Sequence, residues 1–269
     1  MPVANINGVN LNYEVAGQGE AIVFLHGMTG STQDWTNQFS VLSPKYRCVA
    51  LDQRGHGKSA APSREEEYSI QIFADDVLGL LKLLDIKKCC LAGHSIGGFT
   101  TLQFALEHPD MTAALVLVDT SSGQFAMDPS LAQLRQKQDE LARSQGMEAA
   151  FEFSIANNPM MIERLQRHPE LREVTRRKML MTSVDGSIYG MSAIGKWEAV
   201  TPRLSEIKVP ALIYWGEEDL GFTEAVQVLK EGIADSELVT VKGVGHNPHE
   251  EAPDAFNEAL LKFMNRIKW

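Results

Sequence analysis

Short apolar runs alternate with amphipathic segments along most of the chain. Near-continuous apolar runs, typical of strands that a parallel sheet buries on both faces, lie at residues 21–26, 47–52, 88–93, 113–119, 211–216 and 237–243. Apolar residues recur at three- and four-residue spacing in other segments, which predicts helices over residues 68–86, 99–109, 223–233 and 252–267. This alternation predicts an α/β fold with a mostly parallel, doubly wound sheet.

Two segments depart from the alternation. The N-terminal stretch ANINGVNLNYEV alternates on both sides of Asn7-Gly8, a turn signal that predicts an antiparallel hairpin. Residues 121–200 contain no strand-like run, only charge-mixed helical pieces rich in methionine. We therefore expect a core of residues 1–120 and 201–269 with a helical insertion at 121–200. The insertion packs its apolar faces on the core, covers a site with adaptable methionines, or does both.

Length and charge narrow the class of protein. A chain of 269 residues with 44% hydrophobic positions suits one large α/β core carrying an insertion. The net charge of −10 argues against nucleic acid and anionic membrane surfaces, which attract clustered Lys and Arg. We expect a small-molecule substrate and no nucleic-acid or membrane partner, with the oligomeric state open between monomer and homodimer.

The cysteines and the N-terminus indicate the compartment. Cys48, Cys89 and Cys90 lie in apolar runs without C-x-x-C spacing, so we expect buried, reduced thiols rather than a metal or redox site. The N-terminus has no basic region followed by an apolar stretch, and no apolar run approaches the ~20 residues of a membrane span. We expect a cytoplasmic protein.

One serine stands in a glycine-rich bend between a predicted strand and a predicted helix. The stretch reads Gly93-His94-Ser95-Ile96-Gly97-Gly98. The G-x-S-x-G pattern alone is weak, but a strand before it and a helix after it are the context of a nucleophile elbow. Small neighbours allow the close backbone packing that such a bend requires. We interpret Ser95 as a catalytic nucleophile rather than part of a plain turn.

A serine hydroxyl needs a base, and His246 is the leading candidate. It follows the last predicted strand in KGVGHNPHEEAP, at the carboxyl end where α/β sheets place their sites. His249 is the alternative base, or otherwise a surface residue at a helix start. His108 and His168 stand at apparent helix ends and suit surface or capping roles.

The base in turn needs a carboxylate to orient it. Asp219 follows the predicted strand at 211–216, and the chain order Ser, Asp, His is that of α/β-hydrolases. Asp119, at the end of LVLVD, is the alternative acid, or otherwise anchors a loop. Acyl transfer also needs N–H donors for an oxyanion. We assign these donors to the backbone amides of Ile96 and of Met28 in the loop HGMTG.

Four stretches, HGMTGS, DQRGHGKS, AGHSIGG and GVGHNPHEEAP, occur in an order that resembles the α/β-hydrolase superfamily with a helical cap, and WGEED fits its acid position. The resemblance covers nearly the whole chain. It is greatest to the branch of haloperoxidase-like esterases, enol-lactonases and C–C bond hydrolases. It implies triad roles for Ser95, Asp219 and His246, oxyanion roles for the Met28 and Ile96 amides, and no metal or organic cofactor. Residues Asp52, Arg54 and Gly55 match a stretch that usually braces the fold.

Departures from the family pattern bear on the reaction. Haloalkane dehalogenases carry aspartate at the elbow, so Ser95 argues against dehalogenation. The C–C hydrolases often have asparagine before the nucleophile, where this chain has His94, and the acid loop DLGFTEA lacks a frequent proline. We expect hydrolysis of a carboxylic ester, including lactones and thioesters. The alternatives are a C–C hydrolase or lyase-like enzyme and a non-catalytic small-molecule receptor. Trp35 and Trp197 either line the pocket or pack in the core.

Overall fold

The computed structural model describes residues 2–123 and 129–269 and shows one eight-stranded sheet in the order β1-β2-β4-β3-β5-β6-β7-β8. The strands are β1 (Val3–Ile6), β2 (Val9–Ala16), β3 (Ala21–Leu25), β4 (Arg47–Leu51), β5 (Cys89–His94), β6 (Thr112–Val118), β7 (Ala211–Gly216) and β8 (Ser236–Val241). From β4 to β8 across the sheet every neighbouring pair is parallel. The predicted α/β class and parallel sheet are confirmed.

The N-terminal hairpin supplies the antiparallel part of the sheet. Strand β1 pairs antiparallel with β2, and β2 pairs antiparallel with β4. The turn between β1 and β2 holds Asn7 at φ 53° and Gly8 at φ 81°. Both residues lie in the left-handed region that a two-residue hairpin turn requires, and Asn and Gly tolerate that region best. The predicted Asn-Gly turn is therefore confirmed.

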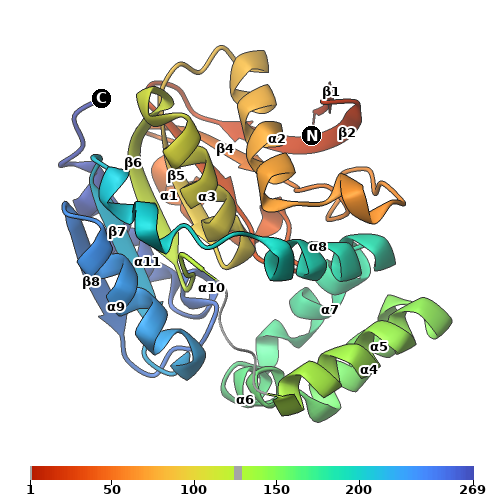
Figure 1. Ribbon diagram of the computed structural model, residues 1–269. Helices are drawn as coiled ribbons and strands as arrows, with labels where there is room; N and C mark the ends of the chain where they lie inside the picture. The colour runs from red at the N-terminus through yellow and green to blue at the C-terminus, as the bar shows by residue number, and fades with distance from the viewer. Residues whose placement is uncertain (1, 124–128) are drawn as a thin grey trace.

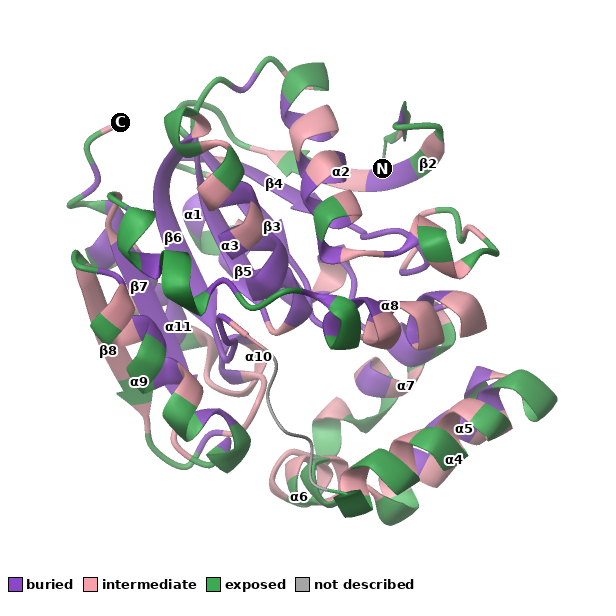
Figure 2. Ribbon diagram, in the orientation of Figure 1, coloured by how far each residue is buried: buried purple, intermediate pink, exposed green. Residues whose placement is uncertain are grey.

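Helices cover both faces of the sheet (Figure 1). Helices α2 (Ile70–Leu83), α3 (Ile96–Glu107) and α9 (Thr223–Gly232) pack on one face, and α1 (Thr36–Leu42) and α11 (Pro253–Met264) pack on the other. All residues of β3, β5, β6 and β7 are buried between these layers, as Figure 2 shows. Burial on both faces explains why these strands read as continuous apolar runs.

The three cysteines lie in strands β4 and β5. Cys48, Cys89 and Cys90 are buried and form no disulfide. Burial raises the pKa of the Cys48 and Cys89 thiols to about 12, so both stay protonated at neutral pH. The predicted buried, reduced state of the three thiols agrees with the structure.

Short helices connect the larger elements. They are α10 (Pro248–Glu251), η1 (Thr32–Trp35), η2 (Glu65–Glu67), η3 (Pro109–Met111), η4 (Pro169–Leu171), η5 (Thr201–Glu206) and η6 (Leu220–Phe222). No element is predicted from the sequence over residues 32–42, where η1 and α1 lie. A capping box formed by Ser31 and Asp34 starts η1, but the two helices together are too short to give a clear apolar period.

The helical insertion leaves the core after β6 and returns before β7. Its helices are α4 (Pro129–Gln145), α5 (Met147–Asn157), α6 (Pro159–Arg167), α7 (Arg172–Leu180) and α8 (Val184–Lys196). Between residues 121 and 200 the described part of the chain contains no strand, as predicted. Residues 124–128 of the predicted insertion lie outside the described residues. Among the helices that the structure describes, we find none with the length and apolar character to span a bilayer.

Two of the methionines of the insertion lie in a small apolar core of its own, separate from the core around the sheet. Met147 and Met179 pack there with Ala142, Ala150 and Phe151. Figure 1 shows α4 and α5 lying apart from the sheet, and Figure 2 shows that much of their surface is exposed. The insertion therefore holds itself together in part and does not depend only on the sheet for burial.

Asp52 and Arg54, which follow β4, form hydrogen bonds that connect this stretch to the hairpin, to α2 and to the loop after β3. The Asp52 carboxylate accepts hydrogen bonds from Asn12 Nδ2 at 2.7 Å, Thr32 N at 2.6 Å and Lys58 N at 2.9 Å. The Arg54 guanidinium donates to both Asp76 oxygens on α2 at 2.8 Å, and both side chains are buried. A buried bidentate pair of this kind fixes geometry as well as charge.

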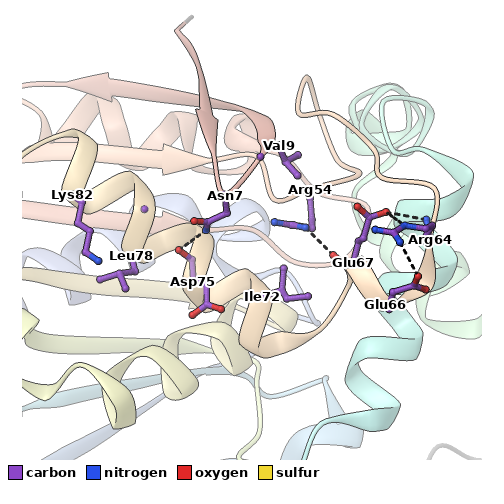
Figure 3. Close-up of a pocket in the computed structure, with 12 residues that line it drawn as sticks. Asn7, Val9, Arg54, Arg64, Glu66, Glu67, Ile72, Asp75, Leu78 and Lys82 are labelled. Atoms are coloured by element: carbon purple, nitrogen blue, oxygen red, sulfur yellow. Dashed lines mark hydrogen bonds and ion pairs between the residues drawn. The ribbon is translucent and has the colours of Figure 1, made fainter.

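Removing one member of the Arg54–Asp76 pair should destabilise the fold. We expect Arg54→Met to lower the free energy of unfolding by about 3–5 kcal/mol, because it leaves a buried carboxylate unpaired. Urea denaturation measures this loss. Arg64 and Arg54 both line a surface hollow between the hairpin turn and α2 (Figure 3). Arg64 forms exposed pairs with Glu66 and Glu67, so Arg64→Met is the control and should leave the midpoint unchanged. Equal midpoints for the two variants would contradict the assignment.

Candidate active site

Ser95 occupies a strained bend between β5 and α3. Its backbone has φ 51° and ψ −117°, a conformation that costs a non-glycine residue energy. A Cβ atom at Gly93 would lie 2.2 Å from the Gly97 carbonyl oxygen, and one at Gly97 would lie 2.3 Å from the Leu25 carbonyl oxygen. Side chains therefore have no room on either side of the bend. Ser95 is half-buried between the fully buried His94 and Ile96, so the bend presents its hydroxyl-bearing residue at the carboxyl edge of the sheet.

Hydrogen bonds to the neighbouring strand hold this bend. Ser95 N donates to the Val118 carbonyl oxygen at 3.0 Å, and the Ser95 carbonyl oxygen accepts from Thr120 Oγ1 at 2.8 Å. A Cβ at Gly98 would lie 2.4 Å from Thr120 Oγ1, so the start of α3 also packs tightly on the end of β6. The surrounding structure thus fixes the strained conformation, as such a conformation requires.

His246 and Asp219 come together from the loops after β8 and β7. His246 Nδ1 and Asp219 Oδ2 are 2.6 Å apart. The Asp219 side chain is 1% exposed, whereas that of His246 is 22% exposed. An ionised carboxylate can only accept, so Nδ1 carries the proton of this hydrogen bond and Nε2 of a neutral ring keeps its lone pair. The Phe222 ring stacks on His246 at 5.1 Å and limits how far the imidazole can turn.

His94 joins this loop to the Ser95 bend, although no role is predicted for it from the sequence. Its Nε2 donates to the His246 carbonyl oxygen at 2.6 Å, and the two rings lie 4.9 Å apart. Burial lowers the pKa of His94 well below its usual value, with the nearby His249 and His246 adding to the effect, so the ring is neutral. The signal in the sequence that could have indicated this contact is the position of His94: a histidine, rather than a small residue, directly precedes Ser95.

The predicted backbone donors flank Ser95. Ile96 follows it directly as the first residue of α3. Met28 follows Gly27, where an added Cβ would lie 3.4 Å from the Ser95 Cβ and 2.5 Å from His94 Nδ1. The loop after β3 therefore approaches Ser95 closely only because residue 27 is glycine. On its other side Met28 contacts the insertion, since a Cβ at Gly190 of α8 would lie 3.0 Å from the Met28 sulfur.

Asp119, the alternative acid, lies behind the His246–Asp219 pair. It is fully buried and its Oδ1 accepts from Gly216 N at 3.1 Å. Burial and the Asp219 charge raise the pKa of Asp119 well above its usual value. One ligand atom each of Asp119, Asp219 and His246 lies within 4.8 Å of the others, but a cation there would have to displace the His246–Asp219 hydrogen bond. The geometry favours Asp219 as the partner of His246 and a loop-anchoring place for Asp119.

Other residues singled out in the sequence pack in the core. His249 is fully buried in α10 and stacks on Trp35 at 4.4 Å, so the expected surface position is wrong. The short helix turns this side chain inward against Trp35 of η1 and Phe256 of α11. Trp197 stacks on Phe99 at 5.0 Å. His108 and His168 end helices α3 and α6, as expected.

Two surface hollows lie away from the candidate residues. One of about 640 Å³ lies between the hairpin turn and α2, where charged side chains line it (Figure 3). Another of about 490 Å³ lies between α2, α3 and the segment that follows α8. Neither is lined by Ser95, Asp219 or His246. The candidate site is identified by the His246–Asp219 hydrogen bond and by the His94 contact that joins the His246 loop to the Ser95 bend.

Fold and site together define a class. A parallel sheet carries a serine on a strained strand-to-helix bend, and a carboxylate-bound histidine follows the last strand. The chain belongs to the α/β hydrolase fold family, whose model matches residues 20–253.

Similar proteins span the whole chain. A putative 2-succinyl-6-hydroxy-2,4-cyclohexadiene-1-carboxylate synthase of Bacillus subtilis is 31% identical over 96% of both chains. The crystal structure of the enol-lactonase from Burkholderia xenovorans superposes with a TM-score of 0.87 at 27% identity, covering 98% of this chain and 100% of that one. A thermophilic esterase from Thermogutta terrifontis gives a TM-score of 0.87 at 25% identity over 99% of each chain. These similar proteins carry the names of different activities: a synthase, an enol-lactonase and an esterase.

Proposed function

We propose that the protein is a serine hydrolase that cleaves a small-molecule carboxylic ester, including lactones and thioesters, through an acyl-enzyme. The observation that carries the proposal is the 2.6 Å His246–Asp219 hydrogen bond next to the strained Ser95 bend. The likeness to an enol-lactonase and an esterase supports the ester class, because a lactone is a cyclic ester.

The proposed first half-reaction transfers the acyl group to Ser95. His246 Nε2 removes the Ser95 hydroxyl proton while Oγ attacks the substrate carbonyl carbon, and Asp219 stabilises the imidazolium that forms. The backbone N–H groups of Met28 and Ile96 donate to the resulting oxyanion. Collapse of the tetrahedral intermediate breaks the bond to the leaving oxygen or sulfur, which takes its proton from His246.

The second half-reaction releases the acid. His246 deprotonates a water molecule, which attacks the acyl carbon, and collapse of the second intermediate returns the proton to Ser95 Oγ. Each step uses side chains and amides of this chain alone, so the scheme requires no metal or organic cofactor. We assign the segment 121–200 the role of a cap that sets substrate size and excludes water, above a core of residues 1–120 and 201–269.

A lyase-like reaction on the same triad is the second candidate. The 31% identity to a putative carboxylate synthase over nearly the full chain favours it. C–C bond hydrolysis belongs to the same candidate, with His94 in place of the asparagine frequent before that nucleophile. A panel of esters, lactones, thioesters and a dienoic diketone separates the candidates by which substrate gives the highest kcat/KM.

Treatment with a fluorophosphonate, followed by mass spectrometry of the intact protein and its peptides, tests the nucleophile. We expect one adduct, located on Ser95, with labelling slowed in His246→Ala. We also expect Ser95→Ala to lose ~10⁶-fold in kcat for ester hydrolysis, as removal of a triad serine does elsewhere. Retained turnover in folded Ser95→Ala protein would overturn the assignment.

Asparagine substitutions distinguish the two acids. Asp219→Asn should lower kcat by about 10⁴-fold, because an amide favours the wrong tautomer of His246. Asp119→Asn keeps an oxygen to accept from Gly216 N and should lose far less. Steady-state kinetics on one ester measures both variants. The opposite order of losses would make Asp119 the catalytic acid.

A further inference from the structure

Five charged side chains, each at most 11% exposed, form an ion network between the insertion and the core. Arg164 of α6 and Lys178 of α7 come from the insertion; Asp34 of η1 and Glu250 and Glu251 of α10 come from the core. Exposure of these side chains is 11% for Arg164, 5% for Lys178, 3% for Asp34, 9% for Glu250 and 1% for Glu251. Charges this far from water are costly unless each has partners.

Each cation of the network joins two carboxylates. Lys178 Nζ lies 3.0 Å from Asp34 Oδ1 and 2.6 Å from Glu250 Oε1. Arg164 Nη2 lies 2.8 Å from Glu250 Oε2, and its Nε lies 3.5 Å from Glu251 Oε1, an ion-pair contact without a hydrogen bond. Every one of these contacts crosses from the insertion to the core.

The Glu251 carboxylate holds the loop that carries His246. Gly245 N donates to Glu251 Oε2 at 2.9 Å, and Asn247 N approaches Oε1 at 3.3 Å. These two amides belong to the residues on either side of His246. Charge-assisted hydrogen bonds of this kind are among the stronger ones in proteins. The orientation of the loop therefore depends on a carboxylate that Arg164 contacts.

The Asp34 carboxylate performs the corresponding role for the loop after β3. Its Oδ1 accepts from Ser31 N at 3.1 Å. Its Oδ2 would lie 2.3 Å from a Cβ at Gly30, so the carboxylate sits directly against the backbone of the turn that contains Met28. Gly30 N closes this turn by donating to the Gly27 carbonyl oxygen at 3.1 Å. Lys178 thus connects the loop bearing one proposed oxyanion donor to the helix that follows His246.

We propose that Lys178 and Arg164 of the insertion are positioning residues. They hold the loop that carries His246 and the loop that carries Met28 in the orientation that catalysis requires. This inference rests on the proposed serine hydrolase mechanism. In it the insertion does more than cover the substrate, because its two buried cations complete the alignment of base and oxyanion donors. A displacement of either loop by about 1 Å is enough to cost ~10²-fold in rate.

Lys178→Met tests the proposal by leaving Asp34 and Glu250 without their shared cation. We expect kcat for a small ester to fall at least ~10-fold with little change in KM, and fluorophosphonate labelling of Ser95 to slow by a similar factor. The conservative Lys178→Arg should recover part of the rate. Arg176→Met is the matched control on α7, since Arg176 pairs with Glu148 inside the insertion, and it should react as the wild type does.

The end point of labelling separates misalignment from partial unfolding. A misaligned but folded site is labelled more slowly yet reaches one adduct per chain, whereas an unfolded fraction lowers the final stoichiometry. Complete labelling at the wild-type rate in folded Lys178→Met would overturn the inference, and absence of labelling in the wild type would instead overturn the proposed function. Should Lys178→Met fail to fold, Arg164→Lys keeps a cation for Glu250 while losing the Nε contact to Glu251. The same slowed but complete labelling is expected there, and an unchanged rate would contradict the proposal.

The network also predicts how stability depends on pH. Burial raises the pKa of Glu250, but Lys178 and Arg164 outweigh burial, with a smaller contribution from His249, and lower it to about 2 from 4.5. Asp34 faces the same lysine, and burial raises its pKa. A lowered carboxyl pKa contributes stability that is full above the unfolded pKa and is lost as pH falls through the folded pKa. The stabilising contribution of Glu250 therefore disappears between about pH 4.5 and pH 2.

Urea denaturation of the wild type and Glu250→Gln at several pH values checks this dependence. We expect a constant difference in midpoint from pH 7 down to about pH 5, and a shrinking difference at lower pH. Glu163→Gln, at an exposed carboxylate of α6, is the control and should show a small difference throughout. A difference between wild type and Glu250→Gln that stays constant down to pH 3 would contradict the assigned charge state.

Discussion

The close packing of the Ser95 bend against the ends of β3 and β6 is the constraint on which the site depends. The positive φ of Ser95 persists because Val118 and Thr120 hold its backbone, and because Gly93 and Gly97 leave no space for the bend to relax. The bend places Ser95 at the carboxyl edge of the sheet and starts α3 at the next residue. Parallel strands end at this edge, so their following loops converge on the same point.

Charge is distributed unevenly around this edge. The chain carries a net charge of −10, yet two of its cations, Arg164 and Lys178, are buried where the insertion meets the loops after β3 and β8. Another buried cation, Arg54, braces the stretch after β4 to α2. Replacing buried ion pairs with apolar residues is often neutral or stabilising, so stability alone is a weak reason for such groups. Geometry is a stronger reason for Arg164 and Lys178, because their carboxylate partners Glu251 and Asp34 accept hydrogen bonds from the backbone of the loops after β8 and β3.

Neither the similar proteins nor the fold identifies the bond that this protein acts on. One superfamily architecture supports a lactonase, an esterase and a putative synthase among the proteins similar to this chain. The fold alone therefore does not specify the reaction, which depends on the residues at the site of each protein.

The sequence by itself determined the class of fold, the strands at the centre and the candidates Ser95, Asp219 and His246. Local signals carry this information: apolar runs for doubly buried strands, an Asn-Gly hairpin turn, and glycines around a serine between strand and helix. The sequence left Asp119 as an alternative acid, contained no clear signal for α1 or for the contacts of His94, and favoured a surface position for His249. Only the tertiary structure shows the His246–Asp219 hydrogen bond, the burial of His249 and the pairing of Lys178 with Asp34 and Glu250. The reason is physical, since such contacts join residues far apart in the chain, and their burial and charge depend on which loops the sheet brings to one edge.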